Sequence, residues 1–111
     1  MDNIYILESD GFYKIGVSTD VDKRVKELQV GNPHKIECIF ARWVPEAYDV
    51  EKELHSMFKE HVVSGEWFKL SADELDLLKD IIVSFMRLCN IGKEDKERVK
   101  NRFLFKNNQN E

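Results

Sequence analysis

Residues 4–17 read Ile-Tyr-Ile-Leu-Glu-Ser-Asp-Gly-Phe-Tyr-Lys-Ile-Gly-Val. Both ends of this stretch are rich in strand-forming side chains, and the Ser-Asp-Gly between them is a turn signal, so the pattern predicts a β-hairpin. Because side chains alternate between the two faces of a strand, Tyr5 lies on the opposite face from Ile4 and Ile6. If the isoleucines face the core, Tyr5 and Lys14 emerge together on the other face.

A helix is expected directly after the hairpin. Thr19 or Asp20 can cap its first turn, and Gly31 with Pro33 ends it. A third strand is expected over residues 36–44, where apolar and β-branched side chains resume.

Further helices complete the predicted order. One should run from about residue 47 to 61, and within it Glu51 and His55 are four residues apart and therefore neighbours on one face. A capping-box signature at residues 71–74 opens the next helix, and a last helical piece is expected over about 94–105. This order predicts an α+β domain, with a small, mainly antiparallel, three-stranded sheet flanked by helices and extra helices at the C-terminal end.

Length and composition exclude several classes of protein. The 111 residues fit one domain, which we expect over residues 1–92, with 93–111 as a basic helical extension and a frayed tail. The apolar share of 42% is too high for a disordered chain. No apolar run is long enough to span a membrane, and the N-terminus lacks the features of a signal peptide, so we expect an intracellular, cytoplasmic protein.

The charge is unevenly distributed. A net charge of −4 argues against strong non-specific binding to DNA, which depends on neutralising phosphates. Basic residues nevertheless outnumber acidic ones near the C-terminal end, where they form either a local anchor for phosphate or the solvated face of a helix with internal ion pairs. These basic residues are Lys93, Lys96, Arg98, Lys100, Arg102 and Lys106.

The two cysteines, Cys38 and Cys89, are far apart and lie in apolar segments. We expect both to be buried thiols. The sequence holds no Cys-x-x-Cys pair, so a structural zinc site is not expected.

Several short motifs resemble those of the GIY-YIG endonuclease superfamily over roughly residues 3–70. The first two are Ile-Tyr-Ile-Leu at 4–7 and Tyr-Lys-Ile-Gly at 13–16, followed by Arg24 at the family's spacing from the second motif. The later helix motif is similar to residues 51–55, and Gly-Glu-Trp-Phe at 65–68 resembles the segment that carries the family's metal-binding glutamate. The versions found here are similar to a compact branch that occurs often in phage and fungal proteins.

The chain departs from the family pattern at two positions. The family's first glycine is Asn3 here, at the start of a strand. The tyrosine of the second motif is Lys14, and the neighbouring Tyr13 points to the opposite face, so it cannot simply substitute. Lysine at this position is typical of the compact branch.

The resemblance implies a metal-dependent endonuclease that hydrolyses phosphodiester bonds in DNA. It implies that Tyr5 is the general base, that Arg24 and Lys14 bind phosphate, and that His55 assists proton transfer. It further implies that Glu66 holds a single Mg²⁺ or Mn²⁺, a type of cation that one or two carboxylates often bind, with water and phosphate completing the shell. Lys93, Lys96 and Arg98 would add contacts to nucleic acid.

Each of these residues also has an ordinary structural interpretation. Tyr5 and Lys14 can be strand residues, Arg24 a surface arginine paired with Asp20 or Glu27, Glu66 a surface glutamate and His55 a structural histidine. Trp67 and Phe68 are most simply core residues, with base stacking as the alternative. The whole chain can then be a non-catalytic module that binds nucleic acid or protein and keeps the fold. The compact chain shows no separate recognition domain, so we expect either low intrinsic specificity or specificity supplied by a second copy or a protein partner.

Overall fold

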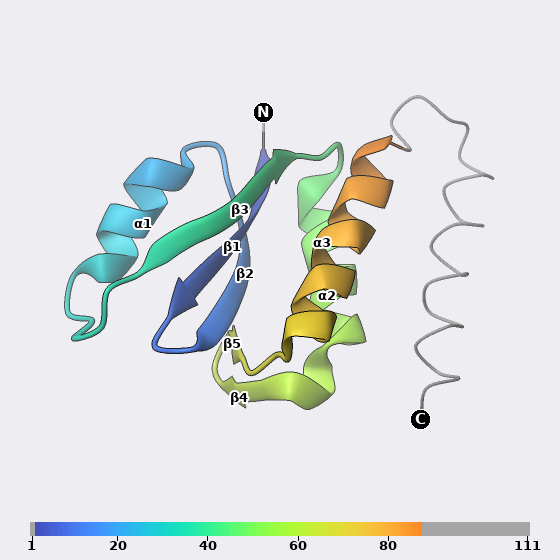
Figure 1. Ribbon diagram of the computed structural model, residues 1–111. Coiled ribbons are helices and arrows are strands. Elements are labelled where there is room, and N and C mark those ends of the chain that lie inside the picture. Colours follow the sequence, from blue (N-terminus) through green and yellow to red (C-terminus); the bar gives the residue numbers. More distant parts are fainter. Residues whose placement is uncertain (1, 88–111) are drawn as a thin grey trace.

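The computed structural model describes residues 2–87 of the 111-residue chain (Figure 1). Cys89, the helical piece expected over 94–105, and Lys93, Lys96 and Arg98 lie outside the described residues. The elements, in chain order, are β1 (Asn3–Ser9), β2 (Phe12–Ser18), α1 (Val21–Gln29), β3 (Glu37–Trp43), α2 (Ala47–Met57), the 3-10 helix η1 (Lys59–His61), β4 (Val62–Ser64), β5 (Trp67–Phe68) and α3 (Ala72–Arg87).

The strands form one antiparallel sheet in the order β3-β1-β2-β5-β4. The predicted α+β class is confirmed, and the sheet has five strands because β4 and β5 extend the three that the sequence indicates. The strand β5 pairs with β2 at only two positions, Tyr13 with Phe68 and Lys14 with Trp67. This short pairing ends beside the cluster of polar side chains described below.

Helices cover both faces of the sheet, with α1 on one side and α2 and α3 on the other (Figure 1). Ile4, Ile6 and Ile15 are completely or almost completely buried in the larger core, against α2 and α3. Tyr5 lies in a smaller core on the other face, where it packs with apolar residues of α1. The alternation predicted for the hairpin is therefore confirmed, although the second face is covered by a helix instead of being open to solvent.

The helix α1 begins and ends where its sequence signals place it. Asp20 is its N-cap, and the side chain of Asp20 accepts a hydrogen bond from the backbone N–H of Lys23 at 3.1 Å. The helix ends at Gln29, just before Gly31, which has a φ of +77°.

The helix α2 is shorter than predicted, because it ends at Met57 instead of His61. Phe58 leaves the helical region at φ −109° and ψ 15° and buries its side chain in the larger core. After this point the chain forms η1, and the carbonyl of His61 accepts a hydrogen bond from the N–H of Lys69 at 2.9 Å. Burial of Phe58 and entry into the β4–β5 hairpin thus replace the last helical turn.

The prediction of a buried thiol at Cys38 is wrong, since this side chain is exposed. Cys38 lies on β3, the strand at the edge of the sheet, next to a break in the pairing with β1 between Ile6 and Leu7. An edge strand is covered less completely than a central one, so an apolar run in sequence does not ensure burial here.

The capping box predicted at the start of α3 is confirmed. The backbone N–H of Glu74 donates to the Ser71 hydroxyl at 3.1 Å, and the backbone N–H of Ser71 donates to the Glu74 carboxylate at 2.8 Å. His61 lies 2.9 Å from the other carboxylate oxygen. The hydrogen bond from the Ser71 backbone is the main cause that lowers the pKa of Glu74, and its burial opposes this change.

Glu74→Ala should lower the free energy of unfolding by about 1 kcal/mol at neutral pH, because it removes one half of the capping box. Since folding lowers the pKa of Glu74, its contribution is present above the ordinary glutamate pKa of 4.5 and is lost as the pH falls through the folded value. Urea unfolding at several pH values measures both effects. Asp73→Ala, in the same helical turn, is the matched control. An equal loss in the two variants at every pH would contradict the account.

Candidate active site

Tyr5 lies directly across from Gly16 in the pairing of β1 with β2. A Cβ atom at Gly16 would lie 2.2 Å from the Tyr5 hydroxyl oxygen and 2.3 Å from the ring carbon that carries it, so the ring occupies the space of the missing side chain. Only 2% of Tyr5 is exposed. Gly16, which corresponds to the second glycine of the GIY-YIG motifs, is thus explained by the space that the Tyr5 ring requires.

Arg24 projects from α1 toward the Tyr5 hydroxyl. Burial is the largest cause that raises the pKa of Tyr5, and the interaction with Arg24 opposes this rise. The same interaction raises the pKa of the Arg24 guanidinium, which also pairs with Glu27 at 3.3 Å. The phenol therefore keeps its proton at neutral pH, beside a fixed positive charge that favours the phenolate.

Lys14 and Glu66 form an ion pair between β2 and the turn that joins β4 to β5. Only 7% of the Lys14 side chain is exposed, against 63% of the Glu66 side chain. The Lys14 ammonium is also 5.9 Å from the centre of the Trp67 ring. Its hydrogen bond to Glu66 is the main cause that lowers the pKa of that carboxyl, which is therefore ionised at neutral pH.

His55 reaches the sheet from α2. Its Nε2 lies 3.0 Å from the backbone carbonyl oxygen of Ile15, and its ring makes an edge contact with Phe68 at 5.1 Å. A carbonyl oxygen can only accept, so Nε2 carries a hydrogen, and in the neutral imidazole the lone pair is on Nδ1. The backbone contact fixes the tautomer and the position of the ring.

Glu51 is a member of this cluster that sequence reasoning did not assign to it. Burial is the largest cause that raises the pKa of Glu51, the charge of His55 opposes the rise, and the charge of Glu66 adds to it. The available signal was the spacing of four residues between Glu51 and His55 on one helix. That spacing showed that the two side chains are neighbours but not that they face the Glu66 turn.

The structure brings all five predicted site residues of the described chain together with Glu51. Besides the direct contacts, the charges of His55 and Arg24 lower the pKa of Glu66, and the charges of Glu51 and Glu66 raise the pKa of Tyr5. We call these six residues the polar cluster: Tyr5, Lys14, Arg24, Glu51, His55 and Glu66. Their separate origins in β1, β2, α1, α2 and the β4–β5 turn mean that only the folded chain assembles them.

The donor set of the polar cluster fits a hard divalent cation. Glu66 is ionised, and the pKa of Glu51 is raised first by burial and further by the charge of Glu66, a repulsion that a bound cation would relieve. Within residues 2–87 no group of three or more His, Cys, Asp or Glu side chains is arranged to hold a metal ion. One or two carboxylates, with water and phosphate as the other ligands, suffice for Mg²⁺.

Residues 3–83 match the family model of the T5orf172 domain. The chain belongs to this family. The T5orf172 domain is related to the GIY-YIG nucleases. No curated protein and no solved structure matched the chain. All six residues of the polar cluster lie inside the matched range of the T5orf172 domain.

No helix of the domain within residues 2–87 is long and apolar enough to cross a membrane.

Gly16→Ala in this T5orf172 domain should lower the free energy of unfolding by about 1–3 kcal/mol, because the new methyl group displaces the Tyr5 ring. The same substitution should cost much less in a Tyr5→Ala background, where the space is already empty. A double-mutant cycle with urea unfolding measures this coupling. Equal costs of Gly16→Ala in the two backgrounds would show that Tyr5 does not occupy the space above Gly16.

Proposed function

We propose that this T5orf172 domain is a metal-dependent endonuclease that hydrolyses phosphodiester bonds in DNA. The observation that carries the proposal is the polar cluster itself. It unites the side chains needed to bind a phosphate, to hold a divalent cation and to exchange a proton, and it draws them from elements far apart in the sequence. Its relation to the GIY-YIG nucleases supports the same reaction.

Arg24 and Lys14 are the proposed phosphate-binding groups. The planar guanidinium of Arg24 can donate two parallel hydrogen bonds to a phosphate and stabilise the charge that develops as the phosphorus is attacked. Lys14 is a point charge on the same face of the sheet as Tyr5, held by Glu66 and Trp67. A phosphate beside these residues would lie against the Tyr5 hydroxyl, where a water can be activated.

Glu66, with Glu51 beside it, is the proposed ligand of Mg²⁺ or Mn²⁺. A cation held there would neutralise charge on the phosphate and lower the pKa of a bound water. The lowered pKa of Glu66 keeps the carboxylate ionised and ready to bind. Because Lys14 pairs with the same carboxylate, the lysine limits how Glu66 can turn and aims it at the polar cluster.

Tyr5 and His55 are the proposed proton-handling groups. The raised pKa of Tyr5 means that the phenol is a hydrogen-bond donor at neutral pH, so its use as a base depends on positive charge next to its oxygen. The Arg24 guanidinium supplies such a charge. His55 has Nε2 fixed by the Ile15 carbonyl, which leaves Nδ1 as the atom that can take up a proton.

One observation favours a second candidate function. Lys14, at the position of the tyrosine in the second GIY-YIG motif, is buried and already paired with the carboxylate that would bind the cation. A chain with this pair can be a non-catalytic module that binds nucleic acid or protein through the same fold. The four residues Tyr5, Arg24, His55 and Glu66 favour the enzyme, since a non-catalytic module has no physical need for all of them.

The proposed substrate contacts extend beyond the described residues. Lys93, Lys96 and Arg98 are proposed as additional phosphate contacts, because they lie in the basic stretch of the sequence. One polar cluster cuts one strand, so cutting both strands of a duplex requires two copies of the chain or two encounters. A homodimer or a protein partner is the proposed source of specificity.

The purified protein should nick supercoiled plasmid at low salt in the presence of Mg²⁺ or Mn²⁺. Glu66→Gln and Arg24→Ala should each slow nicking by about 100-fold or more, because one removes a ligand of the cation and the other a phosphate clamp. Agarose gels of a time course measure the rate. Glu60→Gln and Arg42→Ala change exposed residues outside the polar cluster and should leave the rate unchanged.

Two results would contradict the proposal in different ways. Nicking that persists in Glu66→Gln would show that this carboxylate does not hold the cation. Intact binding without cleavage of single-stranded, duplex or branched DNA would favour the non-catalytic module.

A further inference from the structure

An open pocket of about 180 Å³ lies next to the polar cluster, at the tip of the β1–β2 hairpin. Its wall is formed by the end of the hairpin, by the segment between α1 and β3, and by one residue of β5. The lining residues are Ser9, Asp10, Phe12, Asn32, His34 and Trp67. The function proposed above gives Trp67 only a part in holding Lys14 and assigns no role to the other five residues.

The pocket lies on the same face of the sheet as Lys14 and Tyr5 of the polar cluster. Phe12 is two residues from Lys14 on β2, so both side chains project to the same side, about 7 Å apart along the strand. Trp67 joins the two sites, because it lines the pocket and its ring also lies 5.9 Å from the Lys14 ammonium. A molecule bound at Lys14 can therefore extend into the pocket without crossing the sheet.

The lining residues suit a ligand that is uncharged and planar and that carries hydrogen-bonding groups at its edge. Trp67 and Phe12 offer aromatic surface on which a base can stack, an interaction that every nucleobase can make. Asp10 offers carboxylate oxygens to N–H donors. Since none of the six lining residues is a lysine or an arginine and one is an aspartate, a phosphate is disfavoured there.

The rim of the pocket is held in place by its own hydrogen bonds. The backbone N–H of His34 donates to the Asn32 side-chain oxygen at 3.0 Å, which leaves the Asn32 amide nitrogen as a donor for other groups. The His34 ring lies 3.6 Å from the Asp10 carboxylate, across the mouth between the two segments. Gln29 donates to the carbonyl of His34 at 2.9 Å and ties this segment to the end of α1.

We propose that this pocket binds one unpaired nucleobase, stacked on the Trp67 ring, from a nucleotide adjacent to the phosphate held at Lys14 and Arg24. The inference rests on the proposed function and makes its substrate class more specific. In a duplex both faces of a base are covered by its neighbours, so a base can stack on Trp67 only if it is single-stranded or turned out of the helix. The expected substrates are therefore single-stranded, flapped or branched DNA.

The test uses the full chain and varies the DNA, so that the protein stays intact. The sequence contains two tryptophans, and Trp43→Phe leaves Trp67 as the only tryptophan, which can be excited at wavelengths that tyrosine does not absorb. Short single-stranded oligonucleotides, each with one abasic site at a different position, are titrated without a divalent cation to prevent cutting. The nicking assay is run on the same preparation with Mg²⁺.

The intact oligonucleotide should quench the fluorescence of Trp67. An abasic site at one position should abolish the quenching and weaken binding by about 5- to 100-fold, whereas abasic sites elsewhere should have little effect. His34→Ala should weaken binding of the intact strand but not of the strand that lacks this base. A fully paired duplex should not quench.

Three results would overturn the inference. If nicking occurs but abasic sites at all positions have the same effect on quenching and binding, the proposal of a base pocket is wrong and the proposed endonuclease stands. Quenching by a fully paired duplex equal to that by the single strand would show that Trp67 does not select an unpaired base. Failure to bind any DNA would overturn both the pocket and the proposed function.

Discussion

The contact between Tyr5 and Gly16 is the constraint on which the polar cluster depends. These residues face each other across β1 and β2, and the ring of one occupies the space that a side chain of the other would need. A shift of one residue in the pairing would turn Tyr5 to the opposite face, so the hairpin register and the position of the hydroxyl are fixed together. The smaller core then brings α1 over the ring, and Arg24 of α1 interacts with the Tyr5 hydroxyl.

The balance of charges within the polar cluster follows from this arrangement. Burying the charged ammonium of Lys14 without its partner Glu66 would cost free energy. The same ion pair keeps Glu66 ionised. Burial is the largest cause that raises the pKa of Glu51, the charge of Glu66 adds to this rise, and the charge of His55 opposes it. The positive charges of Arg24 and Lys14 lie beside these carboxylates. A phosphate and a divalent cation together complement such a pattern.

Much of the fold could be predicted from local patterns, since the hairpin alternation, the Asp20 cap and the Ser71–Glu74 capping box all depend on neighbouring residues. The strands β4 and β5 are too short for a clear pattern, and tertiary pairing with β2 creates them. The exposure of Cys38 depends on which strand lies at the sheet edge. The spacing from Glu51 to His55 indicates only that the two are neighbours on a helix; that Glu51 faces the Glu66 turn, and that a pocket forms beside Trp67, depend on segments that meet only after folding.

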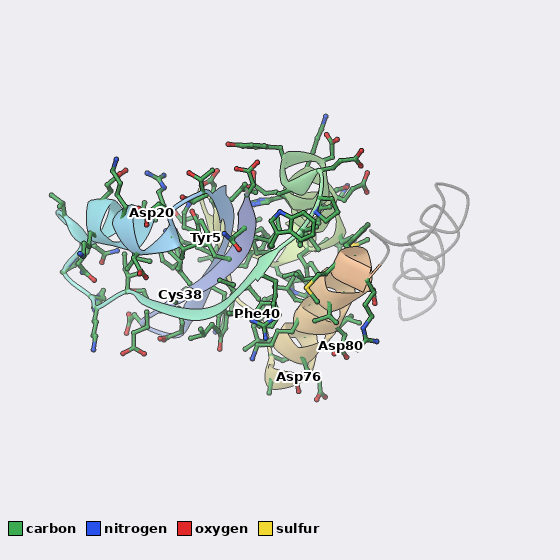
Figure 2. All side chains as sticks on the ribbon, turned by 90° about the horizontal axis from the view of Figure 1, so that it is seen from above. Tyr5, Asp20, Cys38, Phe40, Asp76 and Asp80 are labelled. Atoms are coloured by element: carbon green, nitrogen blue, oxygen red, sulfur yellow. The ribbon has the colours of Figure 1, made fainter. Side chains whose placement is uncertain are left out.

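We propose above all that the polar cluster binds a divalent cation through Glu66 and Glu51. The most direct measurement is the broadening of backbone amide NMR signals by small additions of paramagnetic Mn²⁺. We expect the signals around Glu66 and Glu51 to broaden first, and Glu66→Gln to remove most of the effect. Asp76 and Asp80 on α3 are an internal control, because they form an exposed carboxylate pair away from the polar cluster (Figure 2). Earlier broadening at α3 than at Glu66 would contradict the account.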